Sequence, residues 1–521
     1  MPRDRNLLCC LIILTAGIFL SVLYYSYPVH DYGNYYYGSR FAIEGKNISD
    51  IYEPWKFNLD VRNLPGMQHE KFFLNYAVVP PFTLFFYMPF TIFDVHLSKF
   101  LFNLFSILVF CFFLYRLLRL LNVQSNYILL LPLLVLIPFR NNFLFGQTYL
   151  LITGLIMGGF IAESKNKKLP AAIYYSLAIV LKISPAILLL YLLLRKKFRL
   201  LLLTTLISAA LFFSAASITG WDLMMDYLLK YVPRMSLNEI NNPYAGSYQS
   251  FIVLLRNIFM PDKLLNPDAL FNAPLLFSIA GGTCMGILIF LSIRKIKSTA
   301  SDFSSLAFIL TGSTVLTAYT SSYSLVFLIP LCIHVINQNP KSIGMLMLIF
   351  VAANIPVSVF QHLPVMFRFP RLYLLIILFL LITLDKKILF PEAKWLIASV
   401  AFFIALSLFA VKNRNDNSNY FLRSEAGLLS YDFNFSGNKL LLKTLDENGI
   451  KQSEHILVDS VNSLKPLAIV NHQVYNNGPV TTGSDKKMNP VLINNSQIIY
   501  LSDQNRGIGF YALRKIPVGK N

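Results

Sequence analysis

Long apolar runs, separated by short polar and basic segments, fill the first 411 residues of the chain. The first run, Leu7–Tyr27, is nearly continuous hydrocarbon and ends at Pro28. A helix of about 20 apolar residues spans the roughly 30 Å hydrocarbon core of a bilayer. Because such runs recur, the pattern predicts a polytopic α-helical membrane protein with about 13 membrane segments.

Basic residues gather in short clusters between the apolar runs, and these clusters predict the topology. The positive-inside rule places them in the cytoplasm, so the chain crosses the membrane an even number of times between successive clusters. Several of these pairs of crossings are short and broken. One pair, Tyr127–Phe139 and Thr148–Ala162, flanks an expected turn at Arg140–Gln147. Another pair of half-length arms meets at Lys182–Pro185.

The segment Tyr76–Phe93 contains three prolines, Pro80, Pro81 and Pro89. If this segment crossed the membrane once, every later basic cluster would face outward. Prolines break helices, and a broken element at membrane depth is tolerated only where protein or water covers its backbone. We therefore expect an interfacial or re-entrant segment ahead of a spanning helix at Phe100–Leu121.

The C-terminal part has a different character. A last apolar helix, Ala393–Val411, leads to the outer side, and beyond it Asn, Ser, Asp and Gly are frequent. Short candidate strands in this part are Lys439–Thr444, Leu467–Val474 and Ile498–Ser502. The pattern predicts a small β-rich extracytoplasmic domain over residues 412–521, after a membrane domain over residues 1–411. The membrane domain has two long outer loops, residues 28–75 and 220–272.

Composition agrees with a membrane protein. Hydrophobic residues make up 55% and charged residues 14% of the chain, with a mean hydropathy of +0.55, which excludes an ordinary soluble protein. The net charge of +19 sits in the clusters between apolar runs, where topology and anionic lipid explain it better than nucleic acid does. The five cysteines all lie in apolar runs and form neither a disulfide framework nor a zinc site. Without a small-residue cleavage site, the first helix is expected to be retained in the cell inner (plasma) membrane.

Asp31 lies where an acidic residue is costly, a few residues past the first apolar run. An ionisable residue at the boundary between water and lipid is a functional-site hypothesis, and the alternative is a polar anchor for the helix end. A carboxylate at this place can take the proton of an attacking hydroxyl. The tyrosines that follow form either an interfacial aromatic belt or a platform for a sugar, namely Tyr32, Tyr35, Tyr36 and Tyr37.

Four further polar residues fall in turns assigned to the outer face: Arg140, Gln147, Lys182 and Arg368. Lys182 interrupts an apolar run and is costly there unless it meets water or an anion. Arg140 can instead reach lipid headgroups, and Gln147 can simply begin a helix. A carboxylate and several cations at one membrane depth suit sugar transfer from a lipid phosphate, because the cations stabilise the departing phosphate.

Signatures of several other enzyme classes are absent from the sequence. It has no Walker loop, no Gly-rich dinucleotide turn and no nucleophile elbow. No Asp-x-Asp triplet is present to hold a nucleotide sugar through a metal, and the histidines lack metal-ligand spacing, so no metal and no cofactor is expected. A lipid-phosphate donor needs no metal clamp if Arg and Lys bind the phosphate.

Several short motifs follow one another in a characteristic order. They are Asp31-Tyr32 with its aromatic run, Pro80-Pro81-Phe82, Phe145-Gly146-Gln147, Lys182-Ile183-Ser184-Pro185, and Tyr248-Gln249-Ser250-Phe251 ahead of Leu255-Arg256. Over roughly residues 7–390 this order resembles glycosyltransferase family 87, the polyprenol-phosphate-mannose-dependent mannosyltransferases of GT-C fold. Family members often carry a Trp and His pair late in the chain. The corresponding stretch here, Thr320–Ser324, has no histidine, so no histidine role is carried over.

The resemblance implies a GT-C-like fold and an inverting transfer with Asp31 as the catalytic base. It places Gln147 and Lys182 at the phosphate and sugar end of the donor site. Further candidate donor-binding residues are Arg140, Arg368, Tyr35 and Gln249. The implied reaction moves a hexose, with mannose expected, from a polyprenyl phosphate to a hydroxyl of a glycolipid or glycan on the extracytoplasmic side.

Three other hypotheses stay open from the sequence. A transporter or flippase of lipid-linked sugars would also use broken helices and a lysine at membrane depth. An enzyme of the O-antigen polymerase or ligase type would use diphosphate-linked glycans. An assembly protein would bind cell-envelope partners through its β-rich domain.

Overall fold

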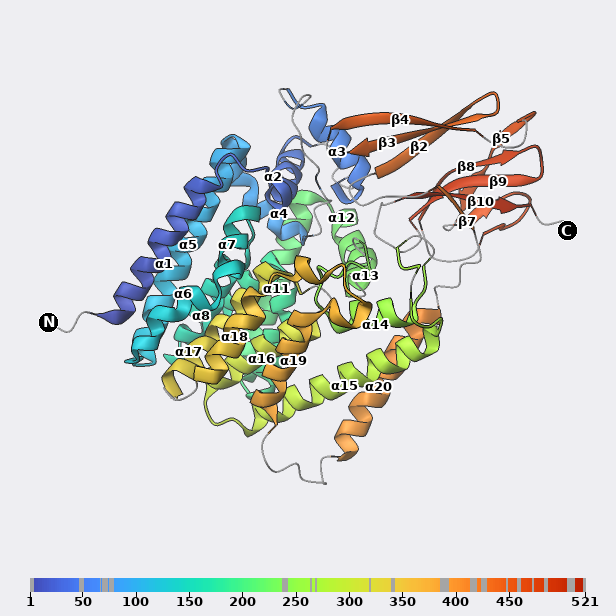
Figure 1. Cartoon of the computed structure of the whole chain (residues 1–521). Helices are drawn as coiled ribbons and strands as arrows, with labels where there is room; N and C mark the ends of the chain where they lie inside the picture. The colour runs from blue at the N-terminus through green and yellow to red at the C-terminus, as the bar shows by residue number, and fades with distance from the viewer. Residues whose placement is uncertain are drawn as a thin grey trace.

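The computed structural model describes most of the chain (Figure 1). The described residues are 4–45, 51–65, 67, 74, 79–236, 242–262, 265–267, 269–317, 320–338, 343–384, 393–412, 419–422, 429–446, 448–456, 461–470, 473–481, 486–503 and 511–518.

The first half of the chain is helical. Its elements are α1 (Arg5–Leu23), α2 (His30–Ile43), α3 (Pro54–Arg62), α4 (Pro81–Tyr87), η2 (Met88–Ile92), α5 (Val95–Leu120), η3 (Asn126–Leu130), α6 (Leu131–Leu134), α7 (Leu136–Phe145), α8 (Tyr149–Ser164), α9 (Lys168–Leu181), η4 (Ser184–Ala186), α10 (Ile187–Leu194) and α11 (Phe198–Thr219). In its described residues, the predicted outer loop over residues 28–75 thus contains the helices α2 and α3.

The remaining helices follow in chain order. They are α12 (Trp221–Asp226), the π-helix η5 (Tyr227–Tyr231), α13 (Val232–Ser236), α14 (Phe251–Phe259), α15 (Pro274–Ser298), α16 (Asp302–Leu316), η6 (Ser322–Leu328), α17 (Ile329–Gln338), α18 (Ile343–Asn354), η7 (Val357–Phe360), η8 (Val365–Phe367), α19 (Pro370–Thr383) and α20 (Ala393–Lys412).

Four helices are long and apolar enough to span a membrane: α1, α5, α11 and α15. Counting η3–α6 and α7, bent by 49° at their break, as one span gives five within the described residues. The other apolar helices are 10–17 residues long. The protein is therefore mostly helical with several apolar spans, while the expected total of about 13 membrane segments stays a prediction.

The helix breaks at Lys182 and Gly146 fall within the predicted turns, but the predicted single arm Tyr127–Phe139 is wrong, because the helix breaks at Val135. The arms α9 and η4–α10 meet at Lys182, whose backbone is extended (φ −158°, ψ 132°). The expected turn at Arg140–Gln147 is wrong in its extent, because α7 continues to Phe145 and ends only at Gly146. Arg140 therefore lies on a helix, since nothing before the glycine breaks the hydrogen-bond ladder. The proline-rich segment forms the short pair α4 and η2, and its residues 76–78 lie outside the described part.

The last helix, α20, packs closely along α15. A Cβ added to Gly282 would lie 2.4 Å from the Cα of Ile404, and one on Gly286 would lie 2.5 Å from the Cα of Val400. Small residues four apart allow two helix backbones to approach this closely within a membrane. The glycine pair therefore fixes the helix that leads into the C-terminal domain.

The C-terminal domain consists of strands beside α3 (Figure 1). The strands are β1 (Asn419–Leu422), β2 (Leu429–Ser436), β3 (Lys439–Asp446), β4 (Gly449–Ile456), β5 (Leu464–Pro466), β6 (Ala468–Val470), β7 (Gln473–Tyr475), β8 (Lys487–Ile493), β9 (Gln497–Ser502) and β10 (Ala512–Pro517). They form a five-stranded sheet in the order β1-β10-β9-β8-β5, a three-stranded sheet β2-β3-β4 and the pair β6-β7.

Two of the predicted strands coincide with observed ones, because Lys439–Thr444 lies in β3 and Ile498–Ser502 lies in β9. The predicted single strand Leu467–Val474 is wrong: the structure divides it between β6 and β7, which pair antiparallel. Buried side chains of both large sheets, among them Leu440, Ile499 and Leu513, share one hydrophobic core.

Candidate active site

Three side chains from distant parts of the chain meet at one place. Asp31 lies in the first turn of α2, Gln147 follows the end of α7, and Lys182 lies at the break after α9. The Gln147 Nε2 donates to Asp31 Oδ2 at 2.6 Å, and the Lys182 Nζ donates to Gln147 Oε1 at 3.1 Å. One glutamine side chain thus separates a carboxylate from an ammonium group.

The orientation of the Gln147 amide follows from its partners. A lysine ammonium can only donate hydrogen bonds, and an ionised carboxylate can only accept them. The amide oxygen must therefore face Lys182 and the amide nitrogen must face Asp31. The hydroxyl of Tyr35 also donates to Gln147 Oε1, at 3.2 Å, which further fixes the amide.

Aromatic rings surround the lysine ammonium. Its Nζ lies 4.0 Å from the ring centroid of Tyr149 on α8 and 5.8 Å from that of Tyr323 on η6. The two rings lie 5.5 Å apart. Such rings stabilise a nearby cation without neutralising it.

Neither Tyr149 nor Tyr323 was among the candidates from the sequence. Tyr149 follows Gln147 by two residues, and Tyr323 lies in the stretch Thr320–Ser324 where family members often have a histidine. The place of Tyr323 in that stretch was the signal in the sequence that could have identified it, because an aromatic ring there can face the Lys182 site.

The local backbone at Gly146 explains how Gln147 reaches Asp31. Gly146 ends α7 in the left-handed conformation (φ 63°, ψ 44°), and the Gln147 N–H then bonds the Asn142 carbonyl. A Cβ on Gly146 would lie 2.7 Å from the Cβ of Tyr32 on α2. Only glycine allows both this conformation and this close approach of α7 to α2.

Gln249 and Arg368 lie in a different contact group. The Gln249 side chain is fully buried, and its amide bonds the carbonyls of Gly246 and Arg368 and the backbone N–H of Arg371. The Arg368 Nε donates to the Leu363 carbonyl at 2.6 Å. Gln249 thereby joins the segment before α14 to the start of α19, and these hydrogen bonds do not extend to the Asp31 group.

Two further arginines, Arg140 and Arg371, differ in their burial. Arg140 is exposed on α7, and its donor role stays a prediction. Arg371, which the sequence reasoning missed, is only 2% exposed. It donates from one terminal nitrogen to the Ile355 carbonyl at 2.9 Å, and its Nε has no hydrogen-bond partner among the described residues. Arg371 lies in the apolar helix α19, and a charged residue in such a helix was the signal in the sequence that could have identified it.

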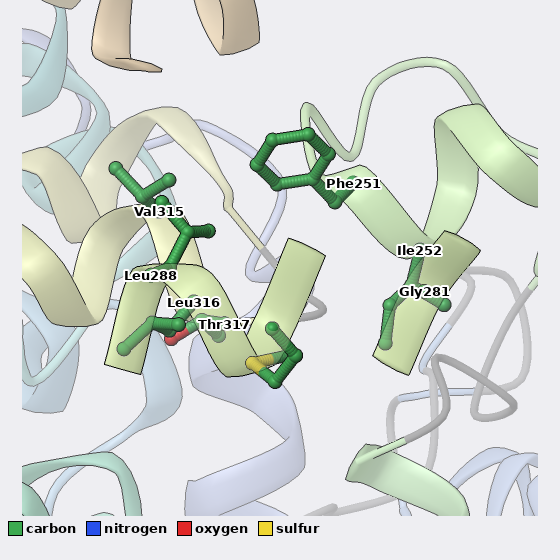
Figure 2. Close-up of a pocket in the computed structure, with 8 residues that line it drawn as sticks. Phe251, Ile252, Gly281, Leu288, Val315, Leu316 and Thr317 are labelled. Carbon is green, nitrogen blue, oxygen red and sulfur yellow. The ribbon is translucent and has the colours of Figure 1, made fainter. Parts of the chain in front are cut away.

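An apolar pocket lies between α14, α15 and α16 (Figure 2). Its lining residues are Phe251, Ile252, Gly281, Met285, Leu288, Val315, Leu316 and Thr317. None of the candidate polar residues lines it, although Phe251 follows Gln249 by two residues. Its lining is apolar apart from Thr317, so it offers few hydrogen-bond partners to a sugar or a phosphate.

Broken apolar helices around a carboxylate, an amide and a lysine define a class of membrane protein that handles polar groups at membrane depth. Residues 78–322 match the model of glycosyltransferase family 87, which confirms the resemblance found in the sequence. The match indicates a membrane glycosyltransferase. Gln147, Lys182 and Gln249 fall inside the matched range, whereas Asp31 precedes it and Arg368 follows it. The search of curated proteins found no match.

Proposed function

We propose that the protein transfers a hexose from a polyprenyl phosphate to a hydroxyl of a glycolipid or glycan, with inversion at C1 and without a metal. The family resemblance supports mannose as the hexose. The reaction takes place on the extracytoplasmic side of the inner membrane, where the domain over residues 412–521 also lies. The observation that carries the proposal is the contact chain from Asp31 through Gln147 to Lys182.

In the proposed reaction the acceptor oxygen attacks C1 of the sugar while Asp31 takes the hydroxyl proton. The bond from C1 to the phosphate oxygen breaks, and the polyprenyl phosphate leaves with the electron pair. An in-line displacement needs the base and the phosphate-binding cation on opposite faces of the sugar. The single glutamine between Asp31 and Lys182 keeps these two groups at separate but coordinated positions.

The environment of Lys182 supports its role at the leaving phosphate. Its hydrogen-bond partner is a neutral amide oxygen and its ring neighbours are neutral tyrosines. A phosphate is a stronger partner than either, because charge-assisted hydrogen bonds are roughly twice as strong as neutral ones. Arg371 is a second buried cation, but its hydrogen bonds join it to Gln249 and Ile355 and not to the Lys182 group. Arg140 and Arg368 stay predicted contributors.

A transfer assay with the purified protein in nanodiscs tests the proposal. The donor is labelled polyprenyl-phosphate mannose, and a membrane glycolipid extract supplies the acceptor. Asp31→Asn keeps the shape of the side chain but cannot accept the proton, so we expect transfer to be slower by about 100–10,000-fold. The matched control is Asp222→Asn, which changes an exposed carboxylate on α12 and should leave transfer unchanged.

The same assay separates the proposal from its alternatives. Wild-type transfer that persists in Asp31→Asn would contradict the assignment of the base. Movement of the intact donor across the bilayer, without a new glycosidic bond, would favour a flippase. Transfer from a diphosphate-linked glycan, but not from the monophosphate donor, would favour an enzyme of the polymerase or ligase type.

A further inference from the structure

The C-terminal domain contacts the first outer loop at Glu53, the residue before α3. The Glu53 side chain is 7% exposed. The Lys486 Nζ lies 2.8 Å from Glu53 Oε2, and the Tyr511 hydroxyl donates to the same carboxylate at 3.2 Å. Both partners belong to the C-terminal domain, more than 400 residues further along the chain.

Two more contacts join the remaining length of α3 to the same domain. The rings of Trp55 and Tyr431 stack with their centroids 5.2 Å apart and 11° between their planes. A terminal nitrogen of Arg62 donates to the Asp446 carbonyl at 2.9 Å. The domain therefore holds α3 at its beginning and at its end.

The Tyr511 hydroxyl is a stable donor to Glu53. Burial raises the pKa of Tyr511 well above its usual value, and the charge of Glu53 raises this pKa further. The hydroxyl thus stays protonated throughout the range in which proteins are folded. A buried carboxylate with an ammonium and a hydroxyl as partners is a defined contact rather than a surface encounter.

Contacts from α3 continue toward Asp31. The ring of Phe57 on α3 packs edge-on against Phe41 on α2, with their centroids 5.8 Å apart. The Ser39 hydroxyl on α2 donates to the Leu84 carbonyl on α4 at 2.7 Å. The helix that carries Asp31 is therefore packed between α3 and α4.

A second route leads from α3 toward Lys182. The hydroxyl of Tyr52, next to Glu53, donates to the Val79 carbonyl just before α4 at 3.0 Å. On α4 the Thr83 hydroxyl donates to the Leu181 carbonyl at 2.7 Å. Leu181 is the last residue of α9 and directly precedes Lys182.

We propose that the C-terminal domain is a positioning element of the active site, and that Glu53 is the positioning residue through which it acts. By holding α3, the domain sets the placement of α2 and α4. Helix α2 carries Asp31, and α4 bonds the carbonyl of Leu181, the residue before Lys182. The effect on rate rests on the proposed function, whereas the mechanical coupling does not.

Glu53→Gln in the full-length protein tests this inference with two readouts. The first is hydrogen exchange of peptides covering α2 and α3, which needs no substrate. The second is the division of any rate loss between kcat and KM for polyprenyl-phosphate mannose. We expect faster exchange over both helices and a kcat lower by roughly 10–100-fold, because a misplacement of about 1 Å can cost about 100-fold. The donor KM should change little.

The matched control is Glu454→Gln, which removes an exposed ion pair with Lys439 within the same domain and should leave both readouts unchanged. Tyr511→Phe should give a smaller change of the same sign, and it replaces Glu53→Gln if that variant does not fold. Unchanged exchange over α2 would overturn the inference. So would faster exchange with an unchanged kcat. If the wild-type protein transfers no sugar, the proposed function fails and the exchange result alone decides the coupling.

Discussion

Replacing Gly146 with alanine tests whether α7 must end directly against α2. The residue has a left-handed backbone, which costs a residue with a Cβ about 1–2 kcal/mol. The added Cβ would also lie 2.7 Å from the Cβ of Tyr32. That atom is attached directly to the α2 backbone, so no side-chain rotation relieves the contact.

The separation of the helices gives the magnitude. Ordinary carbon contacts are about 3.5–4.0 Å, so α7 and α2 must move apart by about 1 Å. Overpacking of this kind costs about 1–3 kcal/mol, and the total destabilisation is then about 2–5 kcal/mol. The same displacement lengthens the 2.6 Å contact between Gln147 and Asp31. We therefore expect kcat to fall by about 100-fold.

The control is Gly45→Ala, just after the end of α2. Gly45 also has a left-handed backbone (φ +64°), but a Cβ there would have no heavy atom within 4 Å. It carries only the backbone cost, so its loss of stability should be about 1–2 kcal/mol and its kcat unchanged. Thermal unfolding in detergent and the transfer rate are measured for both variants. Equal stability and equal kcat in the two variants would refute the reasoning.

Two other changes have defined outcomes. Lys182→Met should raise the KM for the lipid-phosphate sugar and lower kcat by about 100–1,000-fold in the transfer assay. The reason is that the variant loses the ammonium group that would stabilise the negative charge developing on the phosphate. A loss below tenfold would argue against contact of Lys182 with the phosphate. Glu163→Gln removes the charge that pairs with Lys197, but Lys197 keeps Asp302 as a partner. The change should therefore cost about 1.5–3 kcal/mol in thermal unfolding, with kcat of the folded protein retained.

Much of the candidate site could be predicted because chain order and membrane depth are both encoded in the sequence. The apolar runs and basic clusters set the depth of each turn, and this depth already grouped Asp31, Gln147 and Lys182. The direction in which a side chain points around a helix is not encoded in this way when the helix is apolar on all sides. For this reason the sequence did not separate the buried Arg371 from its neighbour Arg368.

The tyrosines show a second limit of the sequence. Tyr149 and Tyr323 contact Lys182 only because α8 and η6 lie side by side, which is a tertiary arrangement with no local signature. The strands of the C-terminal domain were only partly predicted, because apolar residues on both sides of a short polar stretch, as in Leu467–Val474, fit one strand as well as two paired strands. The contacts of this domain with α3 depend on residues more than 370 positions apart.

The central claim is that Asp31 removes the acceptor proton while the sugar leaves the lipid phosphate. A single-turnover measurement with donor already bound tests it most directly, because binding and chemistry are then observed separately. Asp31→Asn should bind polyprenyl-phosphate mannose as the wild-type protein does and transfer the sugar about 100–10,000-fold more slowly. Transfer at the wild-type rate from the donor-bound variant would contradict the account.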